Sequence, residues 1–192
     1  MKSPEQIDKI EAVVLYILQQ FKEGVDYIKL FKIMYFAQRE YLAQNGICIV
    51  EDTFKARLKG PVPALTYKVM KLAENGVDVN DDKRDLEHFL SSIEVGKNQI
   101  VHAIGVPDMD YIPDMEKEEL DKIIRECRDI DSETLSKQSH DEAYNKVVRQ
   151  MDDDPQKDVL TTIDIARAGG ASKAMIDHIR DVQLIRAAFD AD

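Results

Sequence analysis

Hydrophobic positions along the chain recur mostly at helical spacing. They fall every three or four residues over 7–21, and Ser3-Pro4-Glu5-Gln6 just before them is typical of a capped helix start. In residues 30–42, large apolar side chains point in every direction, so this segment predicts a central helix that is covered on most sides. Asp26 is placed to cap that helix, and Asn45-Gly46 suits its C-terminal end.

A period of two replaces the helical period after this helix. Residues 54–58 alternate apolar and basic side chains, which predicts a half-buried strand. The following Lys59-Gly60-Pro61-Val62-Pro63 is expected to stop that strand, because both prolines lack an amide donor and glycine permits a backbone that other residues avoid. Other extended segments are expected at 47–50, 89–95 and 99–104, the last two joined by a hairpin turn at Gly96-Lys97-Asn98.

Shorter repeats of apolar residues predict the remaining helices. These are placed after Pro63, at 116–129, around Leu135 with Ser132 as the cap, from Asp141 onward, at 162–168, and from a Ser172 cap to about residue 189. Polar residues 78–85 predict an exposed loop, and Asp152-Asp153-Asp154-Pro155 predicts a turn and a boundary. The expected fold class is α+β and predominantly helical, with a domain over residues 1–150 and a helical C-terminal extension over 151–192 packed on it.

Composition fits one domain with a sizeable core. The chain has 192 residues, of which 44% are hydrophobic and 33% are charged, the balance of an ordinary folded domain. Its longest apolar run is far below the roughly 18 residues that a membrane span needs, and no signal-peptide pattern opens the sequence. Cys48 and Cys127 have no spacing typical of a disulfide framework or a zinc site. A cytoplasmic protein with reduced cysteines is the expectation.

The net charge of −11 argues against a general nucleic-acid binder, because affinity for a phosphate backbone depends on a basic protein surface. Residues 22–71 nevertheless carry nine Lys and Arg against five Asp and Glu. A locally basic face on an acidic protein suits an acidic protein partner better than it suits DNA.

Side chains suited to catalysis or metal binding are scattered along the chain. His88, His102, His140 and His178 lack the spacing of zinc motifs, and neither a nucleophile elbow nor a phosphate-binding loop occurs. Asp152-Asp153-Asp154 is interpreted as a solvated turn rather than a cation site. The sequence therefore predicts no catalytic, metal or cofactor site. His140 is the best single candidate for a special role, and a structural contact at a helix end is favoured there over catalysis.

Two segments carry a resemblance to a known family. The first is Lys29-Leu30-Phe31-Lys32-Ile33-Met34-Tyr35-Phe36-Ala37-Gln38, followed by the strand that runs into Lys59-Gly60-Pro61-Val62-Pro63 and then by Tyr67. The second is Leu135-Ser136-Lys137-Gln138-Ser139-His140-Asp141-Glu142-Ala143-Tyr144, in which Ser139 stands where Thr is usual and Tyr144 where Trp is usual. In this order and spacing, the two motifs resemble the Panacea domain of SocA-like antitoxins and phage-associated GepA-like proteins, over roughly residues 5–150.

This resemblance implies a function that the residues alone leave open. Panacea-domain proteins act as antitoxins in bacterial and phage toxin–antitoxin systems and neutralise a toxin by direct binding, so the expected partner is a toxin protein encoded beside this one. A SocA-like member also delivers its toxin to a protease, which makes a proteolytic adaptor, or a phage-associated interaction protein without its own toxin, one alternative. An enzyme with an unrecognised site near His140 is another. The helix-turn-helix that some members add is not recognised here, and DNA binding is not expected.

The candidate partner-binding residues come from the first motif and its basic neighbours: Lys29, Lys32, Tyr35, Arg39, Lys59, Gly60, Pro61 and Tyr67. Lysines on a largely buried helix either lay their stems along apolar surface or mark the rim of a contact site. The Lys59-Gly60-Pro61 turn is either only a connection between strand and helix or a rigid surface feature that a partner reads. Aromatic residues are enriched at interface hot spots, although most are core residues. The last helix packs on this domain, on a second copy or on another protein, which leaves a homo-oligomer open.

Overall fold

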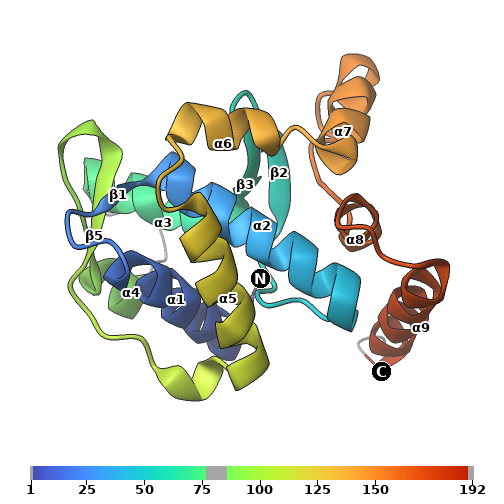
Figure 1. Ribbon diagram of the computed structural model, residues 1–192, viewed down its shortest axis with the longest axis horizontal. Coiled ribbons are helices and arrows are strands. Elements are labelled where there is room, and N and C mark those ends of the chain that lie inside the picture. Colours follow the sequence, from blue (N-terminus) through green and yellow to red (C-terminus); the bar gives the residue numbers. More distant parts are fainter. Residues whose placement is uncertain (1, 77–85, 190–192) are drawn as a thin grey trace.

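The computed structural model describes residues 2–76 and 86–189. Figure 1 shows α2 (Tyr27–Asn45) running through the middle of the molecule, with α1 (Pro4–Gln19) and α5 (Asp114–Cys127) below it and α6 (Ser132–Gln138) above. The other described helices are α3 (Ala64–Asn75), α4 (Glu87–Ser91), α7 (Glu142–Asp153), α8 (Thr162–Ala168) and α9 (Lys173–Phe189). The short strands are β1 (Val25–Asp26), β2 (Phe54–Arg57), β3 (Gly60–Pro63), β4 (Ile93–Val95) and β5 (Ile100–Ala103), with 3-10 turns η2 (Lys97–Gln99) and η3 (Met109–Tyr111). The predicted α+β fold with predominantly helical content is confirmed.

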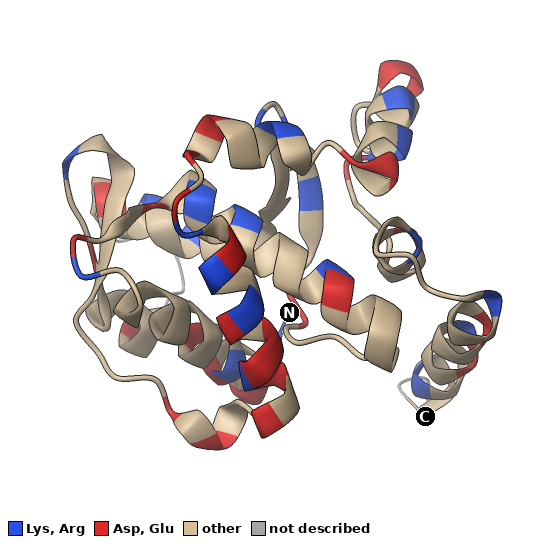
Figure 2. Ribbon diagram, in the orientation of Figure 1, with Lys and Arg blue, Asp and Glu red and all other residues tan. Residues whose placement is uncertain are grey.

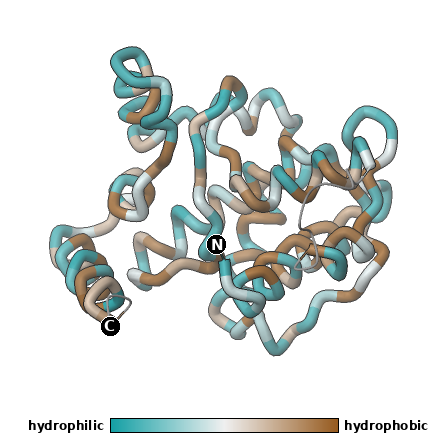
Figure 3. Tube along the Cα trace, turned by 180° about the vertical axis from the view of Figure 1, so that it is seen from behind, coloured by the Kyte–Doolittle hydropathy of each residue, from teal (hydrophilic) through white to brown (hydrophobic). Residues whose placement is uncertain are grey.

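Helix α2 forms the centre of the core, as its apolar residues on every side predict. Residues 30–38 are all buried, and α1, α5, α6, α8 and β3 each pack against this helix. Each large apolar side chain buried in this way contributes roughly 1.5–3 kcal/mol to stability. From behind, in Figure 3, hydrophobic residues run along α1 and α2 in the interior of the fold.

Helix ends follow the local chemistry of the sequence. Ser3 and Gln6 form the predicted capping box, with the Gln6 backbone N–H donating to Ser3 Oγ over 3.2 Å and the Ser3 N–H donating to Gln6 Oε1 over 2.9 Å. The Asp26 carboxylate caps α2 by accepting from the backbone N–H groups of residues 28 and 29. The predicted cap of α6 was wrong by one residue, because Asp131 accepts from the Thr134 N–H and leaves Ser132 as the first helical residue.

Strand β2 ends before Lys59, as predicted, but the segment Gly60-Pro61-Val62-Pro63 is itself strand β3 and pairs antiparallel with β2. Pro61 lies opposite Ala56, whose N–H donates to the other side, to Asp158 O over 2.7 Å. The Ala56–Pro61 pair is therefore a non-hydrogen-bonded pair, and in an antiparallel ladder such pairs alternate with bonded ones. Pro63 lies two residues farther along and occupies the same kind of position. Prolines at alternate positions remove no bond from this ladder.

The second sheet has the order β1-β5-β4 and is antiparallel throughout. The predicted hairpin between 89–95 and 99–104 exists, but its first half is partly helical, because residues 87–91 form α4 with Phe89 fully buried. The segment at 47–50 is a loop and not a strand, and the N–H groups of Ile49 and Val50 donate to the Gln38 side chain over 3.0 and 3.1 Å. The loop expected at 78–85 lies outside the described residues.

The C-terminal residues add two helices beside the core. Asp152 and Asp153 continue α7, and the turn follows at residue 154. Helix α8 packs against α2 and α7, and α9 packs mainly against α8 (Figure 1). In α9 Ile176 and Ile179 are buried, whereas Leu184, Ile185 and Phe189 near its C-terminal end are exposed. The division into a domain over 1–150 and an extension over 151–192 stays a prediction.

Candidate functional site

Three side chains from three different helices hold the β2–β3 hairpin by its backbone. Lys32 Nζ of α2 donates to Pro61 O over 2.6 Å, and Ser136 Oγ of α6 donates to Lys59 O over 2.9 Å. Tyr144 OH of α7 donates to the carbonyl oxygen of Arg57 over 2.9 Å. We call these three hydrogen bonds the clasp. It joins the two sequence motifs, which are about a hundred residues apart along the chain.

Lys32 places a cationic group inside the protein. Its side chain is fully buried, and this burial lowers the pKa of Lys32 to about 7. A charged amine away from water needs a strong acceptor, and a carbonyl oxygen at 2.6 Å supplies it. The positive charge of Lys32, after the larger effect of burial, also lowers the pKa of His140. Lys32 is therefore a structural part of the hairpin junction.

Asp141 forms a second polar junction next to the clasp. Its carboxylate accepts from Tyr35 OH over 2.8 Å and from Arg39 Nη1 over 3.1 Å. The other oxygen of Asp141 caps α7 by accepting from the backbone N–H of Tyr144. Burial, and then the charge of Asp141, strongly raises the pKa of Tyr35, so that this phenol stays a hydrogen-bond donor. The junction fixes the start of α7 against α2.

Gly60 lets the hairpin approach the helices closely. Its φ is 93°, a conformation that residues with a side chain rarely adopt. A Cβ atom at this position would lie 2.2 Å from Ser139 Oγ and 3.0 Å from Lys32 Nζ. The buried hydroxyl of Ser139 donates to Ser136 O over 2.7 Å. No side chain fits between β3 and α6.

His140 lies between the end of α6 and the start of α7. Its ring stacks on the ring of Tyr144 with centroids 4.3 Å apart and an angle of 11° between the planes. The Nε2 atom is buried and has no hydrogen-bond partner among the described residues. Among the described residues, no group of three or more His, Cys, Asp or Glu side chains is arranged so that it could hold a metal ion. Geometry thus gives His140 a packing contact.

The tip of the hairpin projects from this buried junction. Leu58 is 91% exposed, an unusual environment for a large apolar side chain at a fixed turn. Arg57 and Lys59 on either side are exposed as well. Behind the tip, Asp158 pairs with Arg57 at 2.8 Å and with Lys55 at 3.3 Å. The hairpin tip, residues 57–59, is therefore an apolar side chain flanked by two cations on an immobilised backbone.

The eight sequence-predicted residues do not form one surface. Lys32, Tyr35, Gly60 and Pro61 are buried and have almost no surface to offer a partner. Lys59 is exposed, and Tyr67 is 39% exposed while its ring packs edge-on against those of Tyr27 and Phe31. Lys29 and Arg39 are half-buried, and Lys29 Nζ donates to two carbonyl oxygens just beyond α5, those of residues 128 and 130. Partner binding by these residues stays a prediction.

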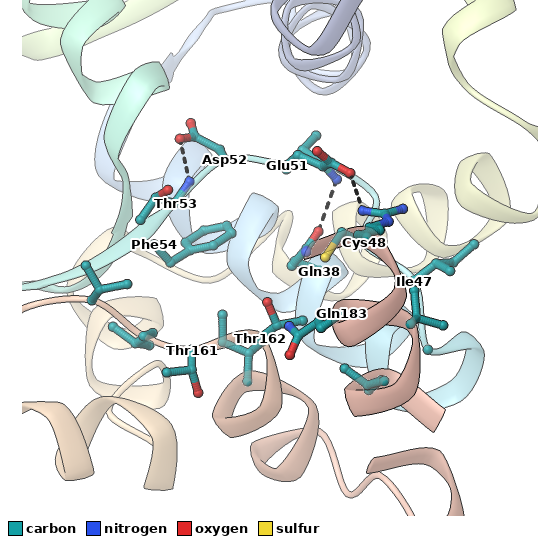
Figure 4. Close-up of a pocket in the computed structure, with 18 residues that line it drawn as sticks. Gln38, Ile47, Cys48, Glu51, Asp52, Thr53, Phe54, Thr161, Thr162 and Gln183 are labelled. Carbon is teal, nitrogen blue, oxygen red and sulfur yellow. Dashed lines mark hydrogen bonds and ion pairs between the residues drawn. The ribbon is translucent and has the colours of Figure 1, made fainter. Parts of the chain in front are cut away.

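Sequence reasoning missed a groove of about 540 Å³ between the loop after α2, the segment 159–162 and α9. Figure 4 shows Gln38 and Cys48 on one wall and Thr162 and Gln183 on the other. Arg186 of α9 and Glu51 both line the groove and form an ion pair at 2.7 Å. The groove exists only because α9 folds back beside the core, and helical spacing alone carries no signal of that packing.

A protein-family model described as "Antitoxin SocA-like, Panacea domain" matches residues 30–145. No curated protein and no solved structure gives a match. In the described ranges, no helix has the length and apolar content that crossing a membrane requires.

The matched region contains both the clasp and the hairpin that the clasp holds. It begins in α2 and ends in the first turn of α7, so it includes every donor of the clasp and the whole β2–β3 hairpin. It also covers well over half of the chain. The chain belongs to the SocA-like antitoxin family that is defined by the Panacea domain.

Proposed function

We propose that this protein is an antitoxin that neutralises a protein toxin by binding it directly, with the hairpin tip in the contact surface. The observation that carries the proposal is membership of the SocA-like antitoxin family over residues 30–145. The clasp supports the choice of surface, because a backbone that is already ordered loses little conformational entropy on binding. Within this proposal the protein acts in the cytoplasm, without DNA binding, and the toxin is encoded by an adjacent gene.

Charge and exposure indicate what the toxin offers to the tip. Leu58 fits a shallow apolar depression, and the cations Arg57 and Lys59 fit acidic groups around it. Such an arrangement has the anatomy of an interface hot spot, in which an apolar anchor is enclosed by a polar rim. The net charge of −11 for the whole chain makes this basic tip distinct from the rest of the surface.

The first experiment is co-expression of the protein with the product of its adjacent gene in bacteria, followed by affinity purification of the tagged protein. Rescue of growth together with a stable one-to-one complex supports neutralisation by direct binding. A harmless neighbour contradicts the antitoxin function. Rescue with loss of the toxin from the cell, and restoration of the toxin in a protease-deficient strain, identifies a proteolytic adaptor instead.

The hairpin tip is tested with Leu58→Asp and Lys59→Glu. Both side chains are exposed, so the free energy of unfolding should change by less than about 0.5 kcal/mol. Loss of a hot-spot anchor costs about 2 kcal/mol or more in binding, so Leu58→Asp should weaken the complex roughly 30-fold. Met115→Asp is the matched control, because Met115 is a 60% exposed apolar residue on α5. Equal affinity of Leu58→Asp and Met115→Asp for the toxin excludes the tip from the interface.

The enzyme alternative makes a different prediction for His140. His140→Ala removes the only imidazole in the region between α6 and α7 and keeps the clasp donors. Neutralisation by binding should survive this change once the protein is shown to fold. Loss of neutralisation with toxin affinity unchanged would favour catalysis.

A further inference from the structure

The segment 158–160 runs alongside β2 and extends the hairpin sheet on the side opposite to β3. The Ala56 N–H donates to Asp158 O over 2.7 Å. The Leu160 N–H donates to Phe54 O over 2.9 Å, and an antiparallel bridge lies between these two hydrogen bonds. Leu160 is only 3% exposed, so its side chain anchors the segment in the core. The segment lies beyond the region that the family model matches, and it places the Asp158 side chain behind the hairpin tip.

Asp158 is the counter-ion of two cations on β2. Its carboxylate lies 2.8 Å from Arg57 Nη1 and 3.3 Å from Lys55 Nζ, and its side chain is only 12% exposed. Although burial opposes it, the hydrogen bonds from Arg57 and Lys55 lower the pKa of Asp158, so this group is charged at neutral pH. One carboxylate balances only one of the two cations. Figure 2 shows basic ribbon on β2 and at the hairpin turn, whereas acidic ribbon gathers on α5 and the segment before it.

The guanidinium group of Arg57 is bound along one side only. Nη1 donates to Asp158 Oδ2 and to Ala56 O, each over 2.8 Å, so both of its hydrogens are used. Among the described residues, Nε and Nη2 form no hydrogen bond, and the side chain is 45% exposed. The N–H groups of Nε and Nη2 on that edge are parallel and match the two oxygens of a carboxylate. Arg57 therefore has an open edge for bidentate binding.

The backbone of Arg57 is immobilised as well. Its carbonyl oxygen accepts from Tyr144 OH in the clasp, and the residue pairs with Gly60 across the hairpin. Lys59, the other cation of the tip, forms no ion pair within the parts of the chain that the structure describes. A long exposed side chain loses rotamer freedom when it binds, and Arg57 has lost much of that freedom before a partner arrives. Arg57 is therefore the preorganised cation of the tip.

We propose that the open edge of Arg57 binds the carboxylate of an Asp or Glu side chain of the toxin through Nε and Nη2, and that Asp158 is the positioning residue that holds the guanidinium for this contact. The inference rests on the proposed function and deepens it, because it names the group on the toxin that the hairpin tip recognises. Asp158 uses Nη1 alone, so the two carboxylates bind the same guanidinium without competing for its donors.

The test measures the affinity of the protein for the product of its adjacent gene by isothermal titration calorimetry. Arg57→Lys keeps the charge and cannot form two parallel hydrogen bonds, so the complex should be about tenfold weaker. Arg180→Lys is the matched control and should bind like the wild type, because Arg180 on α9 is 49% exposed and is likewise bound through Nη1 to one carboxylate, that of Asp177. In the complex, the Nε–H proton signal of Arg57, identified by its loss in Arg57→Lys, should move downfield in NMR spectra because it donates to a carboxylate.

Asp158→Ala separates positioning from charge. The change removes an acceptor of Arg57 Nη1 and keeps the main-chain bond to Ala56. Removal of a negative charge would by itself strengthen the binding of an acidic group, whereas loss of the positioned guanidinium should weaken the complex about fivefold. In the Asp158→Ala background, Arg57→Lys should weaken the complex less than about threefold, since the two changes remove the same contact. Urea titration of each variant checks that it is folded.

Two results in this set overturn the proposal directly. Equal affinity of Arg57→Lys and Arg180→Lys overturns the assignment of Arg57, and unchanged or tighter binding by Asp158→Ala overturns the positioning role. A toxin that loses its affinity when residues are added after its C-terminal carboxylate would identify that group in place of a side chain, which also overturns the proposal. If Leu58→Asp weakens the complex and Arg57→Lys does not, this inference fails and the proposed function stands. If no complex with the adjacent gene product forms, both fail.

Discussion

Replacing Gly60 with alanine is expected to destabilise the protein by about 2–4 kcal/mol. A residue with a side chain at φ 93° costs about 1–2 kcal/mol, of which reduced freedom of the unfolded chain offsets a part. The added Cβ also lies 2.2 Å from Ser139 Oγ, and overpacking of this kind costs about 1–3 kcal/mol. The free energy of unfolding is measured by urea titration with circular dichroism at 222 nm. With an m-value of roughly 2 kcal/mol per molar urea, the midpoint should fall by roughly 1–2 M.

Two further variants separate the causes of that loss. Gly170 has φ 84° and nothing within 4 Å of an added Cβ, so Gly170→Ala carries the conformational cost alone and should lose about 1 kcal/mol. Ser139→Ala removes the hydroxyl group that would clash with the new Cβ atom in Gly60→Ala. The double variant should therefore be at least about 1 kcal/mol more stable than the sum of the two single changes predicts. If Gly60→Ala and Gly170→Ala lose equal stability, the close approach of the hairpin to α6 is refuted.

Three other predictions concern titratable groups. The pKa of Lys32 is about 7 in the folded protein and 10.5 ordinarily, so between these pH values the unfolded chain binds one proton more than the folded chain. As pH rises from about 7 to 9, the free energy of unfolding of the wild type, measured by urea titration, should therefore increase relative to that of Lys32→Met by up to about 1.4 kcal/mol per pH unit. Parallel pH profiles of the two proteins would contradict this. Asp141→Ala should lower the free energy of unfolding by about 2–4 kcal/mol. In a Tyr35→Phe background the same change should cost at least about 1 kcal/mol less, because no phenol hydroxyl is then left without an acceptor. Strictly additive effects of the two changes would exclude the hydrogen bond between Tyr35 and Asp141. The pKa of His88, measured by NMR, should lie above its ordinary value because of the hydrogen bond with Glu11, and should fall in Glu11→Gln.

Features fixed by neighbouring residues could be predicted from the sequence. The capping box at Ser3, the Asp26 cap and the left-handed Gly46 each depend on chemistry within a few residues of a helix end. The central position of α2 also follows from its sequence, since a helix with apolar residues on every side has to be enclosed. These features set the helical framework of the fold.

Features that depend on distant residues could not be predicted in the same way. The apolar residues of a short segment such as 89–95 fit a strand or a helix equally well, and the buried position of Phe89 goes with a helix at the start of this segment. The sequence predicts breaks at the prolines of β3, because it does not show which side of a strand carries each hydrogen bond. The role of Lys32 depends on Pro61, 29 residues away, so a residue predicted at the contact surface proved to be buried. The contact between Glu11 and His88 likewise joins residues 77 positions apart.

The clasp has a consequence for how specificity evolves. Each of its three donors binds a main-chain carbonyl oxygen, at residues 57, 59 and 61, and none binds a side chain of the hairpin tip. Replacement of the tip side chains therefore leaves every clasp acceptor in place. If the hairpin tip contacts the toxin as proposed, the groups that hold the hairpin and the side chains that recognise the target are separate, so substitutions at Leu58 and Lys59 could change the target while the clasp stays intact.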